Sequence, residues 1–448
     1  MDFVEFKKIV IAQCEALGIE EYELYYESEE STTVGVFQQE INQFTGSVEG
    51  GVCFRCISGG KMGYASTEEL SAEQAQSIVR HAVENAQYLE TEEVVFLGEG
   101  GQTYLQVEPA IYPKPETSQL IDTALTTQKT LYSLSDTVAD GSTTRAFTMR
   151  GALAIYNSQG MDLSYVNQLS GITISAMIQE GQEKVSDAQI RLGDLSKIDY
   201  RAQGEKAIAE ATAKLGGKTP DTGMYPVVFS PKAMASLLET FASVFSAERT
   251  QKGLSALAGK EGEQIAAECV TIVDDPLHPE NLFRRNFDSE GSPAYRKNVV
   301  ESGVLATLLH NLKTANTAGV KTTGNASKAG YAGTVSVQPY TMYIAAGDIT
   351  EAELLKQVNN GIYIDFLTGL HAGANAVTGD FSLQSGGYRI ENGSLAERIS
   401  AFTVAGNFYE LLKKILAVAD NMTLPAPVGK TTFGAPSVLV DELSIAGK

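Results

Sequence analysis

Histidine and cysteine are scarce in this chain, and long apolar runs are absent. The 448 residues contain four histidines and four cysteines. So few cysteines do not form a disulfide framework, and a reducing, cytoplasmic location is the simplest interpretation. No stretch approaches the ~20 apolar residues needed to cross a bilayer. The acidic N-terminus, from Met1 to Gly18, does not read as a secretory signal. We therefore expect no membrane association.

Basic residues are also under-represented. Lys and Arg number 34 against 55 Asp and Glu, which gives a formal net charge of −21. Such a field repels phosphate backbones, so we expect no nucleic-acid partner. Hydrophobic residues make up 43% of the chain, as in an ordinary soluble globular protein. The length allows two or three domains with sizeable cores.

The N-terminal half alternates helical and strand-like patterns. Apolar residues at helical spacing predict a helix over Phe3–Leu17, and Gly18 is a plausible stop. Strand-like segments follow, and Thr67 or Ser71 then caps a helix that runs to about Tyr88. The four predicted strands are Tyr22–Val36, Gln38–Phe44, Gly51–Ile57 and Met62–Ala65. This order predicts an α+β unit with a mainly antiparallel sheet and helices.

Glycine and proline at 216–220 mark the best domain boundary, so we predict an N-terminal α+β domain over 1–217. Beyond Tyr225 the pattern changes. A short buried strand leads into a strong helix over Lys232–Phe245, and glycine-divided strand segments fill most of the remainder. The sequence therefore predicts a second, β-rich domain over 218–448.

Motifs for a metal or a nucleophile are weak. No histidine has a partner at the spacing that places two imidazoles on one helical face. No serine lies in a G-x-S-x-G pattern, so a hydrolase nucleophile elbow is absent. Asp274, Asp275 and His278 could together hold a metal across a turn. The flanking prolines, Pro276 and Pro279, favour an ordinary polar loop.

The densest glycine region lies between residues 369 and 393. Such glycines either form tight turns between short strands or let another backbone approach closely. We hypothesise that the segment approaches a bound peptide or a partner's active site, with turns as the alternative. The residues of this candidate chamber are Gly379, Asp380, Ser382, Ser385, Gly386, Gly387, Glu391 and Asn392.

An ordered series of motifs resembles the TldD/PmbA family, and specifically its PmbA (TldE) branch. The series spans nearly the whole chain and includes Gly50-Gly51-Val52, Asn157-Ser158-Gln159-Gly160, Asp274-Asp275-Pro276, Phe287-Asp288-Ser289-Glu290-Gly291, Thr323-Gly324-Asn325-Ala326, Thr378-Gly379-Asp380-Phe381-Ser382, Glu391-Asn392-Gly393 and Ala405-Gly406-Asn407. The resemblance implies a cytoplasmic dimer with an α/β-type N-terminal domain and a β-rich C-terminal domain. Active members look like zinc proteases that trim short or unfolded peptides, and the PmbA branch pairs with them. The older family name, modulator of DNA gyrase, does not imply a DNA-binding surface.

The resemblance also places the zinc ligands of active members, a His-Glu-x-x-x-His helix and a cysteine near the C-terminus. These positions correspond to Leu238, Glu239, Ser243 and Val428. Only the glutamate is retained, and a glutamate without a metal-bound water has nothing to activate. We therefore expect no catalytic residue and no metal in this chain, with zinc only in a TldD-like partner.

Three functional hypotheses follow. The first is a non-catalytic subunit of a cytosolic TldD/TldE-type metalloprotease that acts on peptides or unfolded proteins, paired with a TldD-like subunit or with itself. The second is an active metallopeptidase with unexpected ligands such as Asp274, Asp275 and His278. The third is a stand-alone peptide-binding homodimer. The sequence does not name the substrate or choose between the homodimer and the heterodimer.

Overall fold

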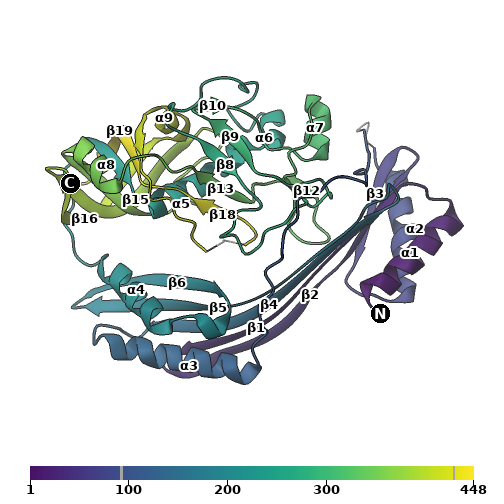
Figure 1. The fold of residues 1–448 in the computed structure, drawn as a ribbon, viewed down its shortest axis with the longest axis horizontal. Helices are drawn as coiled ribbons and strands as arrows, with labels where there is room; N and C mark the ends of the chain where they lie inside the picture. The colour runs from purple at the N-terminus through teal and green to yellow at the C-terminus, as the bar shows by residue number, and fades with distance from the viewer. Residues whose placement is uncertain (91–93, 427–428) are drawn as a thin grey trace.

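A long, curved antiparallel sheet forms the N-terminal part of the computed structural model, which describes residues 1–90, 94–426 and 429–448. Its six strands lie in the order β3-β2-β1-β4-β5-β6, and Figure 1 shows them running beneath the rest of the molecule. Every neighbouring pair is antiparallel. The strands are β1 Tyr22–Phe37, β2 Glu40–Ser58, β3 Lys61–Thr67, β4 Thr143–Asn157, β5 Asp162–Glu180 and β6 Glu183–Gly193.

The two strands predicted over Gln38–Phe44 and Gly51–Ile57 are one continuous strand, β2, so that prediction was wrong. Gly46 and Gly50 lie between the two predicted strands, yet both stay paired with β1, opposite Thr32 and Ser28. Gly50 has φ 145°, and a Cβ there would lie 2.2 Å from the carbonyl oxygen of Glu27. Glycine is therefore required inside the strand by close backbone approach and does not end it.

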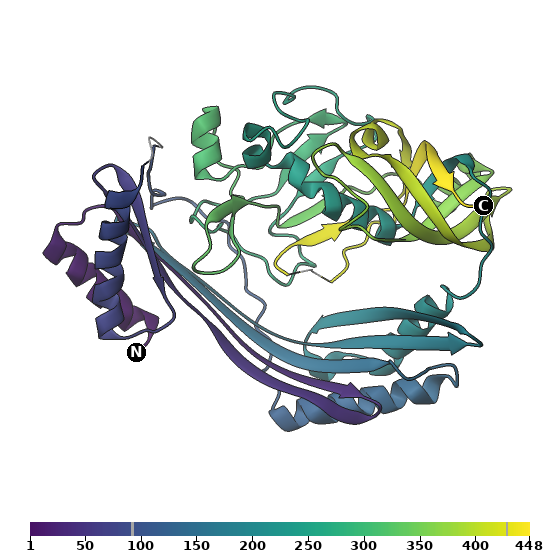
Figure 2. The ribbon, with the colours of Figure 1, turned by 180° about the vertical axis from the view of Figure 1, so that it is seen from behind.

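Helices cover the two ends of this sheet (Figures 1 and 2). At one end lie α1 (Phe3–Leu17) and α2 (Ala72–Tyr88), which the side chains of Asp2 and Ser71 cap as N-cap residues. At the other end lie α3 (Thr117–Leu134), η1 (Leu195–Lys197) and α4 (Tyr200–Thr212). Each helix pair packs on its own hydrophobic cluster.

The C-terminal part is rich in strands. Five strands close on themselves in the order β16-β15-β14-β7-β19, because β16 also pairs with β19, and β17 extends the sheet beyond β19. These strands are β7 Gly223–Phe229, β14 Gly361–Thr368, β15 Asp380–Glu391, β16 Ser394–Asn407, β17 Ile415–Val418 and β19 Val438–Ala446. The structure thus confirms the mixed α+β class with a β-rich C-terminal region.

Two smaller sheets and six short helices complete this part. The first sheet has the order β10-β9-β8-β13-β18, and the second pairs β11 with β12. The strands are β8 Ile272–Asp274, β9 Lys297–Glu301, β10 Val304–Leu305, β11 Ala326–Lys328, β12 Val335–Val337, β13 Thr341–Ile344 and β18 Thr432–Gly434. The helices are α5 Pro231–Phe241, η2 Ala242–Phe245, α6 Ala247–Gln251, α7 Leu312–Ala318, α8 Glu351–Val358 and α9 Phe408–Lys413. Among the described residues, no helix has the length and apolar character to cross a bilayer.

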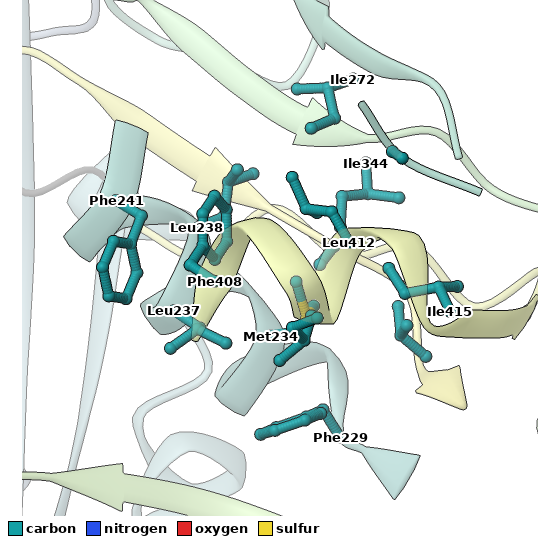
Figure 3. Close-up of a cluster of buried hydrophobic side chains, with 14 of the residues drawn as sticks. Phe229, Met234, Leu237, Leu238, Phe241, Ile272, Ile344, Phe408, Leu412 and Ile415 are labelled. Atoms are coloured by element: carbon teal, nitrogen blue, oxygen red, sulfur yellow. The ribbon is translucent and has the colours of Figure 1, made fainter. Parts of the chain in front are cut away.

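Helix α5 lies at the centre of the C-terminal core (Figure 3). It begins at Pro231, and the hydroxyl of the N-cap Ser230 accepts a hydrogen bond from the Ala233 amide. The rings of Phe241 and Phe408 stack with centroids 4.6 Å apart. Side chains from α5 pack with others from β7, β8, β13, α9 and β17, namely Phe229, Met234, Leu237, Leu238, Ile272, Ile344, Leu412 and Ile415. This packing fixes which stripe of α5 remains on the surface.

Candidate functional site

A groove follows the surface stripe of α5, between that helix and the N-terminal sheet. Its central cavity has a volume of about 670 Å³ and is lined by β6 and α4 on one side. The other side is formed by α5, by β18 and by the segment from Met422 to Ala426. A second cavity of about 430 Å³ continues past the end of α5 and shares Glu239, Thr431 and Phe433 with the first. Glu239 therefore lies where the two cavities meet.

Helical periodicity decides which residues of α5 and η2 reach the groove. Ala235, Ser236 and Glu239 line the central cavity, and Ala242 and Ser243 continue in the next one. These are small or polar residues at spacings of three and four, the pattern of one helix face. The spacing of these residues is present in the sequence, but no histidine marks the stripe, so it was not predicted.

The structure brings together two of the four positions that the family resemblance assigned to the zinc motif. Glu239 and Ser243 both line the groove. Leu238 instead is fully buried in the hydrophobic core (Figure 3), so a side chain at that position does not face the groove. Val428 lies outside the described residues. Glu239 is thus the retained polar group of the motif that the groove presents.

The Glu239 carboxyl is exposed at the groove surface yet partly enclosed by its walls. This partial burial raises the pKa of Glu239, and the nearby His371 acts in the opposite direction. A carboxyl of this kind can accept a hydrogen bond from a peptide N–H and, when protonated, donate one.

A catalytic zinc ion requires three protein ligands, drawn from imidazole, thiolate and carboxylate. Among the described residues, no group of three or more His, Cys, Asp or Glu side chains could hold a metal ion. The residues present in this groove therefore do not fit the zinc site that the motif would build.

Asp274, Asp275 and His278 do not form a metal site either. Asp274 is fully buried, and its Oδ2 accepts hydrogen bonds from Lys297 at 3.1 Å and from Asn325 at 2.7 Å. Its Oδ1 accepts the backbone N–H of Tyr340 at 2.8 Å. Asp275 Oδ1 and His278 Nδ1 each accept a backbone N–H of their own loop. The alternative set of ligands is therefore engaged in holding the loop.

Charged side chains close the groove at the start of α5. Asp187 of β6 is almost fully buried, and its Oδ2 lies 2.7 Å from Lys214 Nζ and 3.0 Å from Lys232 Nζ. Burial would raise the pKa of Asp187, but hydrogen bonds from the two lysines outweigh burial and lower it. Lys232 lies in the first turn of α5, so this ion pair joins the N-terminal sheet to the C-terminal part.

The residues of the candidate chamber lie in β15 or directly beside it, and none of them lines either of these cavities. A Cβ on Gly386 would lie 2.5 Å from the Phe366 ring, and one on Gly387 would lie 1.9 Å from the Tyr363 carbonyl oxygen. The close approach at these glycines is therefore to β14 of the same sheet.

The polar members of the segment are mostly exposed. Asp380, Ser382, Glu391 and Asn392 lie on the surface, whereas Gly379 is buried and Ser385 donates to the Leu383 carbonyl. Their proposed role beside a bound peptide stays a prediction.

Comparison with known proteins places this geometry in a family. Residues 22–86 match the description "PmbA/TldA metallopeptidase domain 1", residues 112–215 match its central domain, and residues 222–447 match its C-terminal domain. A Haemophilus influenzae protein named "Metalloprotease PmbA homolog" is 24% identical, with 91% of this chain and 88% of that protein covered.

Solved structures are similar over the whole chain. A Thermotoga maritima protein described as a modulator of a DNA gyrase is 31% identical, with a TM-score of 0.89 over 99% of this chain and 100% of that one. TldE from Thermococcus kodakarensis shares the fold at 22% identity, with a TM-score of 0.86 over 98% of this chain and 99% of that one. The chain belongs to the PmbA/TldD metallopeptidase family.

Proposed function

We propose that this chain is the non-catalytic subunit of a cytosolic TldD/TldE-type metalloprotease that acts on peptides or unfolded proteins. The partner is a TldD-like subunit, or a second copy of this chain, and the zinc ion belongs to the TldD-like subunit. The net charge of −21 argues against nucleic acid as a partner.

The observation that carries this proposal is the groove-facing stripe of α5. It presents Ala235, Ser236, Glu239, Ala242 and Ser243, and none of them is an imidazole or a thiolate. Without a metal-bound water, Glu239 has no nucleophile to activate. The groove keeps hydrogen-bonding groups and open volume, which suit the wall of a substrate chamber.

A reconstitution assay tests the proposal. The purified chain is incubated with short unstructured peptides alone and then with a purified TldD-like subunit. We expect no hydrolysis by the isolated chain and hydrolysis by the mixture at a rate well above that of the TldD-like subunit alone.

Two results would contradict the proposal. Hydrolysis by the isolated chain that a chelator abolishes would support an active metallopeptidase with atypical ligands. Tight peptide capture by a homodimer, with no effect on any TldD-like subunit, would support a stand-alone peptide-binding protein.

A further inference from the structure

A third cavity, of about 300 Å³, lies between the middle of the N-terminal sheet and the C-terminal part. Residues of β1, β4 and β5 form its floor, and Phe283, Arg285, Tyr340 and Lys430 form its roof. It shares no lining residue with the groove along α5. Its volume is at the lower end of the range of small-molecule sites.

Arg285 brings a cation without a carboxylate partner into this cavity. Its Nη2 donates to Tyr340 Oη at 3.2 Å, and the guanidinium lies 5.3 Å from the centroid of the Tyr340 ring. A guanidinium has five N–H donors, and no carboxylate of a described residue forms an ion pair with it. Asp288 lies near enough to influence Arg285 electrostatically. The oxygens of Asp288, however, accept backbone N–H groups of Glu290, Ser292 and Ala326.

Two further polar atoms of the wall lack partners. Tyr165 Oη and Glu27 Oε2 are shielded from solvent, and neither forms a hydrogen bond within the described chain. Glu27 Oε1 forms an ion pair with Lys430, so the charge of that lysine is already balanced. Buried polar groups are normally satisfied, and the half-buried guanidinium of Arg285 is a suitable partner for an anion bound in the cavity.

Ser28 and Asn167 add polar groups to the remaining wall, whose other part is apolar. Met149, Ala152 and Leu153 of β4 line it together with Phe283. One guanidinium without an ion pair among the described residues, beside the acidic residues Glu27 and Glu29, suits a single negative charge better than a dianionic phosphate. An arginine guanidinium and a carboxylate can form a bidentate pair through two parallel hydrogen bonds.

We propose that this cavity binds the α-carboxylate of an apolar amino-acid residue, either a free amino acid or the C-terminal residue of a short peptide. Arg285 anchors the carboxylate, Tyr165 supplies a hydroxyl donor, and Met149, Leu153 and Phe283 enclose the side chain. The acidic side of the cavity, at Glu27, receives an α-amino or amide N–H group. This binding site goes beyond the proposed function and needs no partner subunit.

Calorimetric titration of the full chain with four related compounds tests the site. Leucine, N-acetylleucine and glycylleucine carry the carboxylate, and leucinamide does not. We expect binding of at least one of the first three, with leucinamide at least about tenfold weaker, because a charge-assisted hydrogen bond is lost. Tighter binding of leucine identifies the free amino acid as the source, and tighter binding of glycylleucine identifies a peptide C-terminus.

Two variants separate this site from nonspecific binding. Arg285→Lys keeps the charge but loses the two-pronged geometry, so affinity should fall about tenfold, whereas the exposed control Arg145→Lys should leave it unchanged. Tyr165→Phe removes a hydroxyl that has no partner, so it should keep the melting temperature and weaken binding severalfold. Equal binding of leucinamide, no binding of any carboxylate at millimolar concentration, or unchanged affinity in Tyr165→Phe would overturn the proposal.

Discussion

At the scale of single residues, the two adjacent glycines of β15 differ in what they contact. A Cβ on Gly387 would meet only backbone atoms of β14, the nearest at 1.9 Å, and these cannot move alone. A Cβ on Gly386 would meet the ring of Phe366, which is partly exposed and can rotate. The backbone of β14 therefore constrains Gly387 more tightly than the Phe366 ring constrains Gly386.

We predict that Gly387→Ala lowers the free energy of unfolding by about 3 kcal/mol, and Gly386→Ala by about 1 kcal/mol. Urea denaturation measures both. Gly330→Ala is the control, because a Cβ there would meet nothing within 4 Å. Equal losses in the two β15 variants would contradict this prediction, because they would mean that the β14 backbone shifts to make room for the Cβ added at position 387.

Glu290 gives a residue-scale prediction about pH. It is buried where the N-terminal sheet meets the C-terminal part, with Arg55 Nη1 4.0 Å from its Oε1. Burial raises the pKa of Glu290 from 4.5 to about 7, against the opposing effect of Arg55. The folded chain therefore keeps a proton that the unfolded chain releases, and this contribution to stability falls as pH rises from about 4.5 to about 7.

Glu290→Gln removes this titration. Between pH 5 and pH 8 the wild type should lose about 1–3 kcal/mol of stability relative to the variant. Urea denaturation of both proteins at several pH values measures the difference, which cancels the titration of groups that do not interact with Glu290. A difference that stays constant with pH would mean that Glu290 is ionised throughout.

At the scale of elements, strand β6 and helix α5 are joined by one buried carboxylate. Asp187→Asn leaves Lys214 and Lys232 without their shared anion, and we expect a loss of about 1–2 kcal/mol at pH 7. Because the pKa of Asp187 is lowered, this loss should shrink as pH falls through the acid range.

A matched control lies on α4. The exposed pair Arg201–Glu205 is an i, i+4 contact on a helix surface, so Glu205→Gln should cost about 0.5 kcal/mol or less. Chemical denaturation measures both variants, and an equal cost would contradict the special role of Asp187.

Elements were predictable from the sequence where local signals agreed. Gly18 ends the first helix and Ser71 caps the second as expected, because caps act on neighbouring residues. The continuity of β2 was not predictable, since glycine at 46 and 50 reads as a break unless the facing strand is known. The groove was also hidden, because β6, α4, α5 and β18 are far apart in the chain and only tertiary packing brings them together.

The buried orientation of Leu238 has the same origin. Residues 238 and 239 are consecutive in the motif, but the side chains of successive residues on a helix point about 100° apart. One therefore faces the core and the other the groove. The family membership, the α+β class and the β-rich C-terminal region were all identifiable from the sequence. The pocket around Arg285 was not, since its walls come from six separate segments.

At the scale of the whole molecule, the chain has the fold of the PmbA/TldD metallopeptidase family, and no group of three or more His, Cys, Asp or Glu among its described residues could hold a metal ion. The N-terminal sheet and the C-terminal part enclose a groove, and the described groove residues offer one carboxylate at the former motif. Under the function proposed above, such a chain contributes walls and contact surface, and the chemistry belongs to the partner.

Zinc content is the measurement that tests this central claim most directly. The chain is purified without an affinity tag, incubated with excess zinc, desalted and analysed for metal, in parallel with its complex with a TldD-like subunit. We predict far less than one zinc ion per isolated chain and about one per pair of subunits, because thiolate and imidazole ligands are lacking here. About one tightly held zinc ion per isolated chain would contradict the account.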